Sequence, residues 1–252
     1  MRESVVSRVT PQEQASDPSA FLSDLQRRFE GAPAKEVLSA VLTEIFPSKV
    51  AVVSSFGAES AVLLHLVAEI DPATPVLFID TRRHFAETLE YRQMVIARLG
   101  LACVRDVGPS PEEEARLDAG LNRFAWDPDG CCAFRKVAPL ERALAGFAAW
   151  VTGRKQFQAP TRQHLPLFEL DGRHIKVNPL ATWTAADVAD HMVRHGLPAH
   201  PLVAKGYWSI GCAPCTSAVG IGEHQRDGRW RGSQKIECGI HRPADSTAGE
   251  AK

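Results

Sequence analysis

Three short apolar runs alternate with helical patterns in the first half of the chain, and this alternation constrains the fold more than any other feature. The apolar runs are Lys49–Ser54, Pro75–Ile79 and Leu101–Val107, and the helical patterns between them are Ser60–Ile70 and His84–Leu99. Strands buried on both faces of a parallel sheet are short and nearly all apolar, and helical crossovers usually connect them. The pattern therefore predicts a βαβαβ series in an α/β fold, with a mostly parallel central sheet flanked by helices.

Further elements are predicted on both sides of this series. Asp171-Gly172 is typical of a two-residue hairpin turn, Thr184 of a helix N-cap and Gly196 of a helix end. The remaining predicted elements are helices over Phe21–Phe29, Glu36–Phe46, Cys131–Ala145 (interrupted near Pro139) and Thr184–His195, a strand over Ala148–Thr152, and a hairpin of Leu165–Leu170 with Arg173–Asn178.

Composition and charge exclude a membrane-spanning protein and disfavour nucleic acid as a partner. The apolar runs are far shorter than the about 20 residues of a transmembrane helix. Met1–Ser19 lacks the apolar core of a secretory signal, so we expect a cytoplasmic protein. The 29 Lys and Arg residues balance 30 Asp and Glu residues, and a net charge of -1 gives no general attraction to phosphate backbones.

The ends of the chain differ in composition from its middle. Residues 1–16 are polar, and we expect them to be disordered. Residues 17–219 contain no repeat or low-complexity linker, which predicts one α/β domain. Residues 220–252 begin with a stretch rich in glycine and charge, which predicts a flexible tail.

Two loops at predicted strand ends are candidate anion-binding segments. The first, from Ser54 to Ser60, offers small residues, serine hydroxyls and a helix N-terminus, and Asp80-Thr81 follows the next strand. A plain turn explains the first loop equally well, and the lysine of a Walker A loop is missing. The candidate residues are Ser54, Ser55, Phe56, Gly57, Ala58, Glu59, Ser60, Asp80 and Thr81.

The six cysteines are the sharper chemical signal. Cys131, Cys132, Cys212 and Cys215 supply four thiolates, the number that a tetrahedral zinc ion or a four-iron four-sulfur cluster needs. Neighbouring residues on a helix point about 100° apart, and a wide cluster accommodates that divergence better than one ion. The alternative is that Cys131 and Cys132 are small buried apolar residues. Cys103 is predicted to lie in the core.

Cys238 stands apart near the chain end, flanked by Lys235 and His241. Nearby cations favour a thiolate, so Cys238 is a candidate nucleophile, with an incidental surface thiol as the alternative. Basic side chains at strand ends suit a phosphate or sulfate ligand. The residues concerned are Arg154 next to Gly153, Arg162, Arg226 and Arg229.

Six motifs in this order resemble the assimilatory adenylylsulfate (APS) reductases of the phosphoadenylylsulfate (PAPS) reductase family. They cover about residues 50 to 241: SFGAES at Ser55–Ser60, DTRRHFAETLEYR at Asp80–Arg92, CCAFRKVAPL at Cys131–Leu140, TGRKQFQAPTR at Thr152–Arg162, GYWSIGCAPCT at Gly206–Thr216 and ECGIH at Glu237–His241. The resemblance implies an adenine-nucleotide alpha hydrolase-like fold.

The resemblance also implies roles for individual residues. Cys131, Cys132, Cys212 and Cys215 match the ligands of one 4Fe-4S cluster per chain, Lys136 matches the lysine beside it, and Cys238 matches the catalytic nucleophile. Arg226 and Arg229 would assist catalysis, and Gly153, Arg154, Arg162 and His241 would join the two loops in binding substrate.

The implied reaction is the thioredoxin-dependent reduction of APS to sulfite and AMP through an S-sulfocysteine, within sulfate assimilation and cysteine biosynthesis. Glutaredoxin is the alternative reductant, and the family often forms homo-oligomers. The cysteine pairs favour APS over PAPS as substrate, with a dual APS/PAPS reductase as the alternative.

One position departs from the family pattern, because Arg82 follows Asp-Thr where glycine is usual. We expect Arg82 to be strained, or to point outward, or to reach a ligand phosphate and modify nucleotide affinity. Two rival functions remain. An ATP-dependent tRNA-thiolating enzyme shares the fold, although Phe56 and Glu59 depart from its Ser-Gly-Gly-x-Asp-Ser loop. A redox-sensing cluster protein that binds nucleic acid lacks a recognisable DNA-binding module here.

Overall fold

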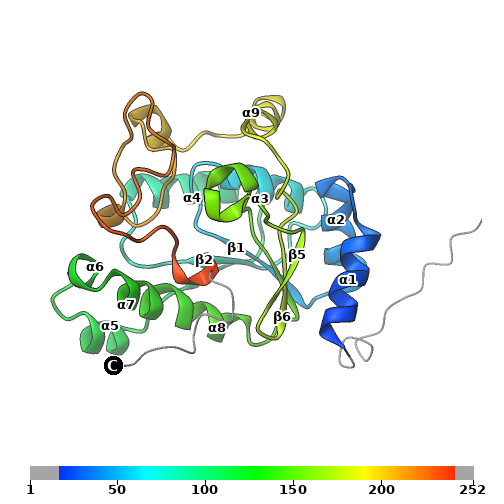
Figure 1. The fold of residues 1–252 in the computed structure, drawn as a ribbon, viewed down its shortest axis with the longest axis horizontal. Helices are drawn as coiled ribbons and strands as arrows, with labels where there is room; N and C mark the ends of the chain where they lie inside the picture. The colour runs from blue at the N-terminus through cyan, green and yellow to red at the C-terminus, as the bar shows by residue number, and fades with distance from the viewer. Residues whose placement is uncertain (1–16, 242–252) are drawn as a thin grey trace, which may run out of the picture.

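The computed structural model describes residues 17–241, which surround a six-stranded sheet (Figure 1). The strand order is β3-β2-β1-β4-β6-β5, and every neighbouring pair is parallel except the hairpin of β5 and β6. This arrangement confirms the predicted α/β fold. The strands are β1 (Val50–Ser54), β2 (Val76–Ile79), β3 (Val104–Val107), β4 (Ala149–Val151), β5 (Phe168–Asp171) and β6 (His174–Val177).

Helices cover both faces of the sheet, which explains why β1 is apolar at nearly every position. Val50 and Val52 pack into one core with the helices α1 to α4, whereas Ala51 and Val53 pack into a second core with α8. Successive side chains of a strand point to opposite faces, so a strand covered on both sides needs apolar residues throughout. The helices are α1 (Pro18–Arg28), α2 (Ala34–Ala40), α3 (Ser60–Ala68), α4 (Ala86–Leu99), α5 (Pro111–Leu117), α6 (Arg123–Trp126), α7 (Pro128–Cys132), α8 (Ala138–Leu144) and α9 (Ala185–Arg194).

Several predicted ends and turns are confirmed by local geometry. Thr184 caps α9 by accepting a hydrogen bond from the Asp187 backbone N–H, and the Asp187 carboxylate accepts a hydrogen bond from the Thr184 backbone N–H. Gly196 follows α9 with φ +56°, and Gly172 turns the hairpin with φ +60°. These positive φ values favour glycine because an L side chain there meets its own backbone.

Three elements differ from the sequence predictions. The helix predicted over 131–145 is α7, a π-helical turn over Ala133–Val137, and α8, so the irregularity ends before Pro139, which lies in the first turn of α8. The acidic helix α5 was not predicted, because it buries none of its side chains and its sequence therefore lacks the apolar periodicity of a buried helix face. The prediction for Cys103 is wrong, because β3 begins one residue later at the sheet edge and leaves this cysteine half-buried.

The chain after α9 crosses the carboxyl edge of the sheet. Its described part, up to residue 241, contains the short helices η6 (Pro201–Lys205), η7 (Ala213–Cys215) and η8 (Gly239–His241), and Figure 1 shows the last of these, in red, beside the central strands. The predicted disordered residues 1–16 and the last part of the predicted tail, 242–252, lie outside the described residues. Among residues 17–241, no helix is both long enough and apolar enough to cross a bilayer.

Candidate active site

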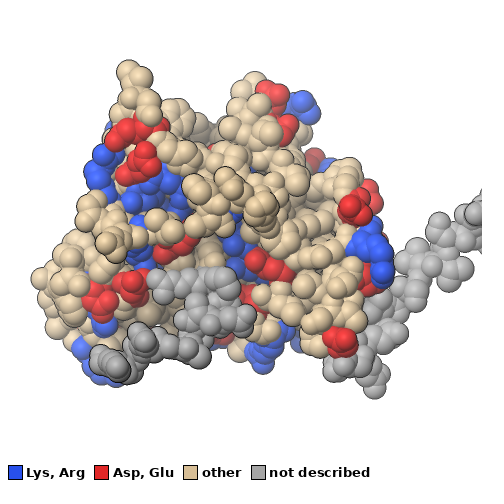
Figure 2. Space-filling model, viewed as in Figure 1, with Lys and Arg blue, Asp and Glu red and all other residues tan. Residues whose placement is uncertain are grey.

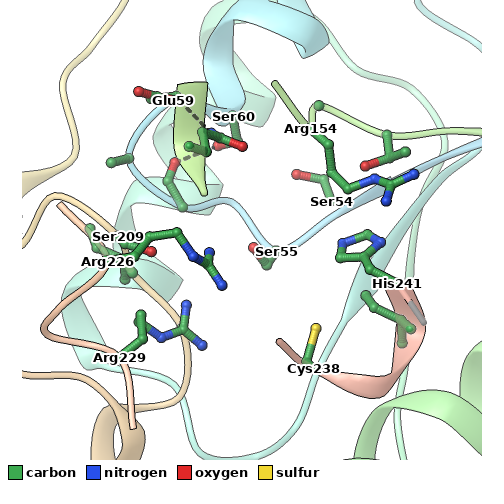
Figure 3. Close-up of a pocket in the computed structure, with 18 of the residues that line it drawn as sticks. Ser54, Ser55, Glu59, Ser60, Arg154, Ser209, Arg226, Arg229, Cys238 and His241 are labelled. Carbon is green, nitrogen blue, oxygen red and sulfur yellow. Dashed lines mark hydrogen bonds between the residues drawn. The ribbon is translucent and has the colours of Figure 1, made fainter. Parts of the chain in front are cut away.

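A cavity of about 220 Å³ lies where β1, β2 and β4 end at their carboxyl edge. The loops that follow these strands form its floor, and residues from 208 to 241 close it from the other side (Figure 3). Ligands of open parallel sheets bind at this edge because the strand-end loops and helix N-termini face it. The cavity therefore brings together segments that lie far apart in the sequence, from Val53 to His241.

The loop after β1 lines the cavity with small and polar groups. The Ser54 hydroxyl accepts a hydrogen bond from the Phe56 backbone N–H at 3.1 Å, and the Ser60 hydroxyl donates to the Gly57 carbonyl at 2.7 Å. A Cβ on Gly57 would lie 3.3 Å from the Ile210 carbonyl, so a larger residue would crowd the loop against the closing segment. The loop is thus tightly folded before α3 begins.

Two predicted substrate-binding residues, Phe56 and Asp80, do not line the cavity. Phe56 has φ +50° and its fully buried ring packs edge-on against Phe78, with 5.6 Å between centroids. Asp80 instead accepts a hydrogen bond from the Arg82 backbone N–H at 2.8 Å. The turn directs the Phe56 ring into the core, and the Asp80 carboxylate is used within its own loop. The prediction that these two side chains line the cavity is therefore corrected.

A buried ion pair joins two walls of the cavity. The Lys155 ammonium lies 2.8 Å from the Glu59 carboxylate, which also accepts a hydrogen bond from the Gln158 side chain at 2.8 Å. Burial lowers the pKa of Lys155, and Glu59 opposes this effect. Sequence reasoning counted Lys155 among the cations of this segment but did not predict its pairing with Glu59, and it did not select Gln158, although both belong to the TGRKQFQAPTR motif.

Basic side chains converge on the other half of the cavity. Arg154, Arg162, Arg226 and Arg229 all line it, and Figure 2 shows Lys and Arg side chains gathered in a recess of this face beside the C-terminal segment. Burial lowers the pKa of Arg154 and of Arg226 to about 10. Carboxylates of Glu169 and Glu237 pair with three of these arginines, and guanidinium donors gathered in this way also suit a phosphate or sulfate.

Arg229 has the least satisfied of these guanidinium groups. Within residues 17–241 it makes no ion pair, its Nε is buried without a hydrogen-bond partner, and it lies 4.5 Å from the Trp230 ring centroid. The backbone of Gly211 passes close to this guanidinium, so a Cβ at that position would push the end of the Arg229 side chain aside. Arg229 therefore has donors available to a ligand.

The predicted nucleophile points into the cavity beside these cations. Cys238 is half-buried, and Figure 3 shows its Sγ directed into the space between Arg229 and His241. His241 is stacked on Trp150, with 6.2 Å between ring centroids, and its Nδ1 is buried without a hydrogen-bond partner. Burial, reinforced by nearby cations, holds the pKa of His241 well below its ordinary value.

Lys176 is a further cation that the sequence did not single out. It projects from β6, lies 4.6 Å from the Trp150 ring centroid, and places its Nζ 3.4 Å from the Ile240 carbonyl. Burial, with Arg154 adding like charge, lowers the pKa of Lys176 to about 7. A lysine inside a buried strand was the available signal, because charged residues are rarely buried without a partner.

The four paired cysteines line a second, smaller cavity next to the first. Cys131 and Cys132 come from α7, Cys212 directly precedes η7, and Cys215 is its last residue. Lys136 lines both cavities, and the Thr81 hydroxyl lies 3.3 Å from the Cys212 Sγ. Burial disfavours the charge of Lys136, but the surrounding thiols outweigh it and raise its pKa.

The donor set of this second cavity fits an iron-sulfur cluster. Four thiols share it with Lys136, Arg135 and Arg83, and the Arg83 Nε is buried without a hydrogen-bond partner. Arg135 is paired with Glu114 and Asp118, which leaves Lys136 as the cation best placed to offset the negative charge that four thiolates bring. In the described part of the chain no three His, Cys, Asp or Glu side chains are spaced to hold one metal ion, so the fit to a cluster rests on the chemistry of the donors and not on their spacing.

A family model described as the phosphoadenosine phosphosulfate reductase domain matches residues 49–218, more than half of the 252 residues. The chain belongs to this family. The resemblance drawn from the sequence motifs is confirmed, and this member of the phosphoadenosine phosphosulfate reductase family is an enzyme, an oxidoreductase.

Relatives of this family member carry two different names. The adenosine 5'-phosphosulfate reductase of Mesorhizobium japonicum is 52% identical over 206 residues, which are 82% of this chain and 81% of the relative. The phosphoadenosine 5'-phosphosulfate reductase of Gloeobacter violaceus is 40% identical over 225 residues, 87% of this chain and 93% of the relative.

A solved structure agrees with the fold of this family member. The phosphoadenylyl-sulfate reductase of Candida auris, in a phosphate complex, superposes with a TM-score of 0.66 at 29% identity. The match covers 81% of this chain and 98% of that chain. It lends independent support to the adenine-nucleotide type of α/β fold.

The structure brings most of the predicted site residues of this family member into one place. Apart from Phe56 and Asp80, every predicted catalytic and substrate-binding residue lines the larger cavity, and the four predicted cluster ligands line the smaller one. The residues of the larger cavity are Ser54, Ser55, Gly57, Ala58, Glu59, Ser60, Thr81, Lys136, Gly153, Arg154, Arg162, Arg226, Arg229, Cys238 and His241.

Proposed function

We propose that this enzyme reduces APS to sulfite and AMP, with Cys238 as nucleophile. The observation that carries the proposal is the half-buried Cys238, which lines the same cavity as four arginines at the carboxyl edge of the sheet. A thiolate approaching a doubly anionic ligand needs cations around both. No other cysteine among residues 17–241 combines partial exposure with this cationic surrounding.

In the first step, the Cys238 thiolate attacks the sulfur of APS. An S–S bond forms, the bond between sulfur and the bridging phosphate oxygen breaks, and that oxygen keeps the electron pair as AMP leaves. The products are AMP and a Cys238 S-sulfonate. Arg226, Arg229 and Lys136 lower the barrier by neutralising the sulfate and phosphate charge, and Arg162 and Arg154 hold the substrate.

In the second step, a thioredoxin thiolate attacks the Sγ of Cys238 and expels sulfite. The resulting mixed disulfide is resolved by the second thioredoxin thiol, which restores the Cys238 thiolate and leaves thioredoxin oxidised. Cys238 is half-buried in the cavity, so the segment over 220–241 must swing outward for this step. Glutaredoxin is the alternative reductant, and we place the reaction in the cytoplasm, in sulfate assimilation and cysteine biosynthesis.

The loop over Ser54–Ser60 holds the adenylate, with Thr81 and Gly153 on the adjoining walls. APS is favoured over PAPS by the name of the 52% identical relative and by the two cysteine pairs. The 40% identical relative that carries the PAPS reductase name supports the dual APS/PAPS reductase as the alternative.

We assign Cys131, Cys132, Cys212 and Cys215 as ligands of a 4Fe-4S cluster. These residues would hold a cluster whose charge would lie beside the substrate, and the cluster would not need to exchange electrons because the electrons come from thiols. Lys136 lines both cavities, so its ammonium can bridge that charge and the substrate sulfate. A homo-oligomer remains part of the proposal through the family resemblance alone.

The test is mass spectrometry of anaerobically purified protein after incubation with APS or PAPS in the absence of thiols. One sulfonate on the Cys238 peptide with APS, released as sulfite by reduced thioredoxin, is the expected result. Cys238→Ser should form no adduct, whereas Cys103→Ser should form it as the parent protein does. Equal labelling by PAPS would establish the dual reductase, and no adduct from protein that retains its iron and sulfide would contradict the proposal.

A further inference from the structure

The carboxylate of Glu237 occupies the arginine donors of the cavity. Its two oxygens accept hydrogen bonds from Nε and Nη2 of Arg162 at 2.7 and 2.9 Å, and one of them also accepts from Nη2 of Arg226 at 3.1 Å. The side chains of Glu237, Arg162 and Arg226 are 15%, 8% and 16% exposed. Glu237 therefore provides an anion for two of the four arginines of the cavity, and Glu169 provides one for Arg154.

This carboxylate uses the donors that a substrate anion would need. The fork of a guanidinium binds carboxylate, phosphate and sulfate through the same parallel N–H groups. Burial alone would raise the pKa of Glu237, but Arg162, Arg226 and Arg154 outweigh it, so the pKa is lowered and the group is ionised. Two anions cannot share the same forks, because the donors are few and like charges repel.

Glu237 is also the residue next to the nucleophile. Arg226 donates to the backbone carbonyl of Ile236 at 2.9 Å as well as to Glu237, so one guanidinium holds both the side chain and the backbone of this segment. If Arg226 turns to a substrate anion, both contacts weaken together. The position of Cys238 is thereby linked to the occupancy of the arginines.

We propose that Glu237 is a built-in competitor for the substrate anion: it holds Arg162 and Arg226 while the cavity is empty and is displaced when the sulfate or phosphate of the substrate binds. The inference rests on the proposed function for the identity of that anion. Displacement lowers the net affinity for substrate and frees the segment that carries Cys238. Glu237 is a positioning residue, since it acts through the arginines.

The test compares Glu237→Gln with a matched control, Glu223→Gln. Glu223 lies in the same C-terminal segment, forms a similar two-oxygen pair with Arg231, is 35% exposed, and does not line the cavity. Dissociation constants for AMP and for inorganic sulfate are measured by calorimetry on anaerobically purified protein. The rate of Cys238 alkylation by iodoacetamide is measured with and without sulfate.

Removing the competing charge should strengthen the binding of both anions by about fivefold, which corresponds to about 1 kcal/mol. In the parent protein, sulfate should accelerate the alkylation of Cys238, and in Glu237→Gln the reaction should already be fast without sulfate. Glu223→Gln should match the parent protein in both measurements.

Unchanged or weaker anion binding by Glu237→Gln would overturn the inference. If Cys238 alkylation became faster without any gain in anion affinity, the role of Glu237 would be purely structural. Anion binding that strengthens as expected, in a protein that forms no Cys238 sulfonate with APS, would uphold the competitor and remove the reductase function. A normal Cys238 sulfonate with APS, combined with anion affinities that Glu237→Gln leaves unaltered, would uphold the reductase function and remove the competitor.

Discussion

The ammonium of Lys155 lies 2.8 Å from the carboxylate of Glu59, across 96 residues of sequence. The pair fastens the loop that follows β4 to the loop that follows β1, and the Lys155 side chain is 2% exposed. The two loops form adjoining walls of the cavity. Together with the hydrogen bond from Gln158 to the same carboxylate, this pair ties the two walls of the site at the sheet edge.

We predict that Lys155→Met destabilises the protein by about 3 kcal/mol, because it leaves Glu59 partly buried without its cation. Combining it with Glu59→Gln should cost less than the sum of the two single changes, measured by urea unfolding. The exposed pair of Lys205 with Glu87 provides the control, and Lys205→Met should cost less than about 1 kcal/mol. A Lys155→Met protein no less stable than Lys205→Met would contradict the prediction.

Arg82 adopts the left-handed conformation that the family's usual glycine favours. Its φ is +56°, and its side chain turns away from the cavity to an ion pair with Glu114 at 3.1 Å. Of the expectations from sequence, strain and an outward side chain are both observed. An effect on nucleotide affinity stays a prediction.

We predict that Arg82→Gly is more stable than Arg82→Ala by about 1 kcal/mol, because both lose the ion pair and only alanine keeps the strain. Urea unfolding of the two variants measures the difference. AMP affinity, measured beside it, tests whether the loop transmits any effect to the cavity. Equal stability of the two variants would show that the positive φ carries no cost at this position.

Buried imidazoles, His191 and His200 among them, should make the protein less stable in mild acid. Burial lowers the pKa of His191 and of His200 to about 4 from an ordinary value of 6.5. His200 accepts a hydrogen bond from the Leu202 backbone N–H, which requires a neutral ring nitrogen. Between pH 6.5 and 4 the unfolded chain binds more protons than the folded one, so stability is full above this window and declines as the pH falls through it.

Each imidazole should contribute about 2 kcal/mol to this loss. The measurement is the free energy of unfolding as a function of pH, and His200→Asn should flatten the decline. His164→Asn, which removes an exposed imidazole, is the matched control. A decline of the same size in His200→Asn and in the parent protein would exclude His200 as a source.

The cysteine cavity predicts a definite metal content. Protein purified without oxygen should contain about four iron atoms and four sulfide ions per chain. Cys215→Ser should lose most of both and the visible absorbance with them, whereas Cys103→Ser, outside the cavity, should retain them. A colourless protein with zinc and no acid-labile sulfide would contradict the cluster assignment.

The sequence by itself determined the elements and the chemical groups of this protein. Period and composition are local properties, so β1, the helices α3 and α4, the cap at Thr184 and the turn at Gly172 could be predicted before any contact was known. The helix α5 could not, because its stability comes from caps and charges rather than from a buried face.

Only the tertiary structure decided which of these groups meet. Glu59 pairs with Lys155, Arg162 pairs with Glu237 from 75 residues away, and the Phe56 ring enters the core rather than the cavity. A charged residue has the same local pattern whether it faces water or a buried partner. Its environment is set when distant strands align at one sheet edge, since burial and the nearest opposite charge exist only in the folded chain.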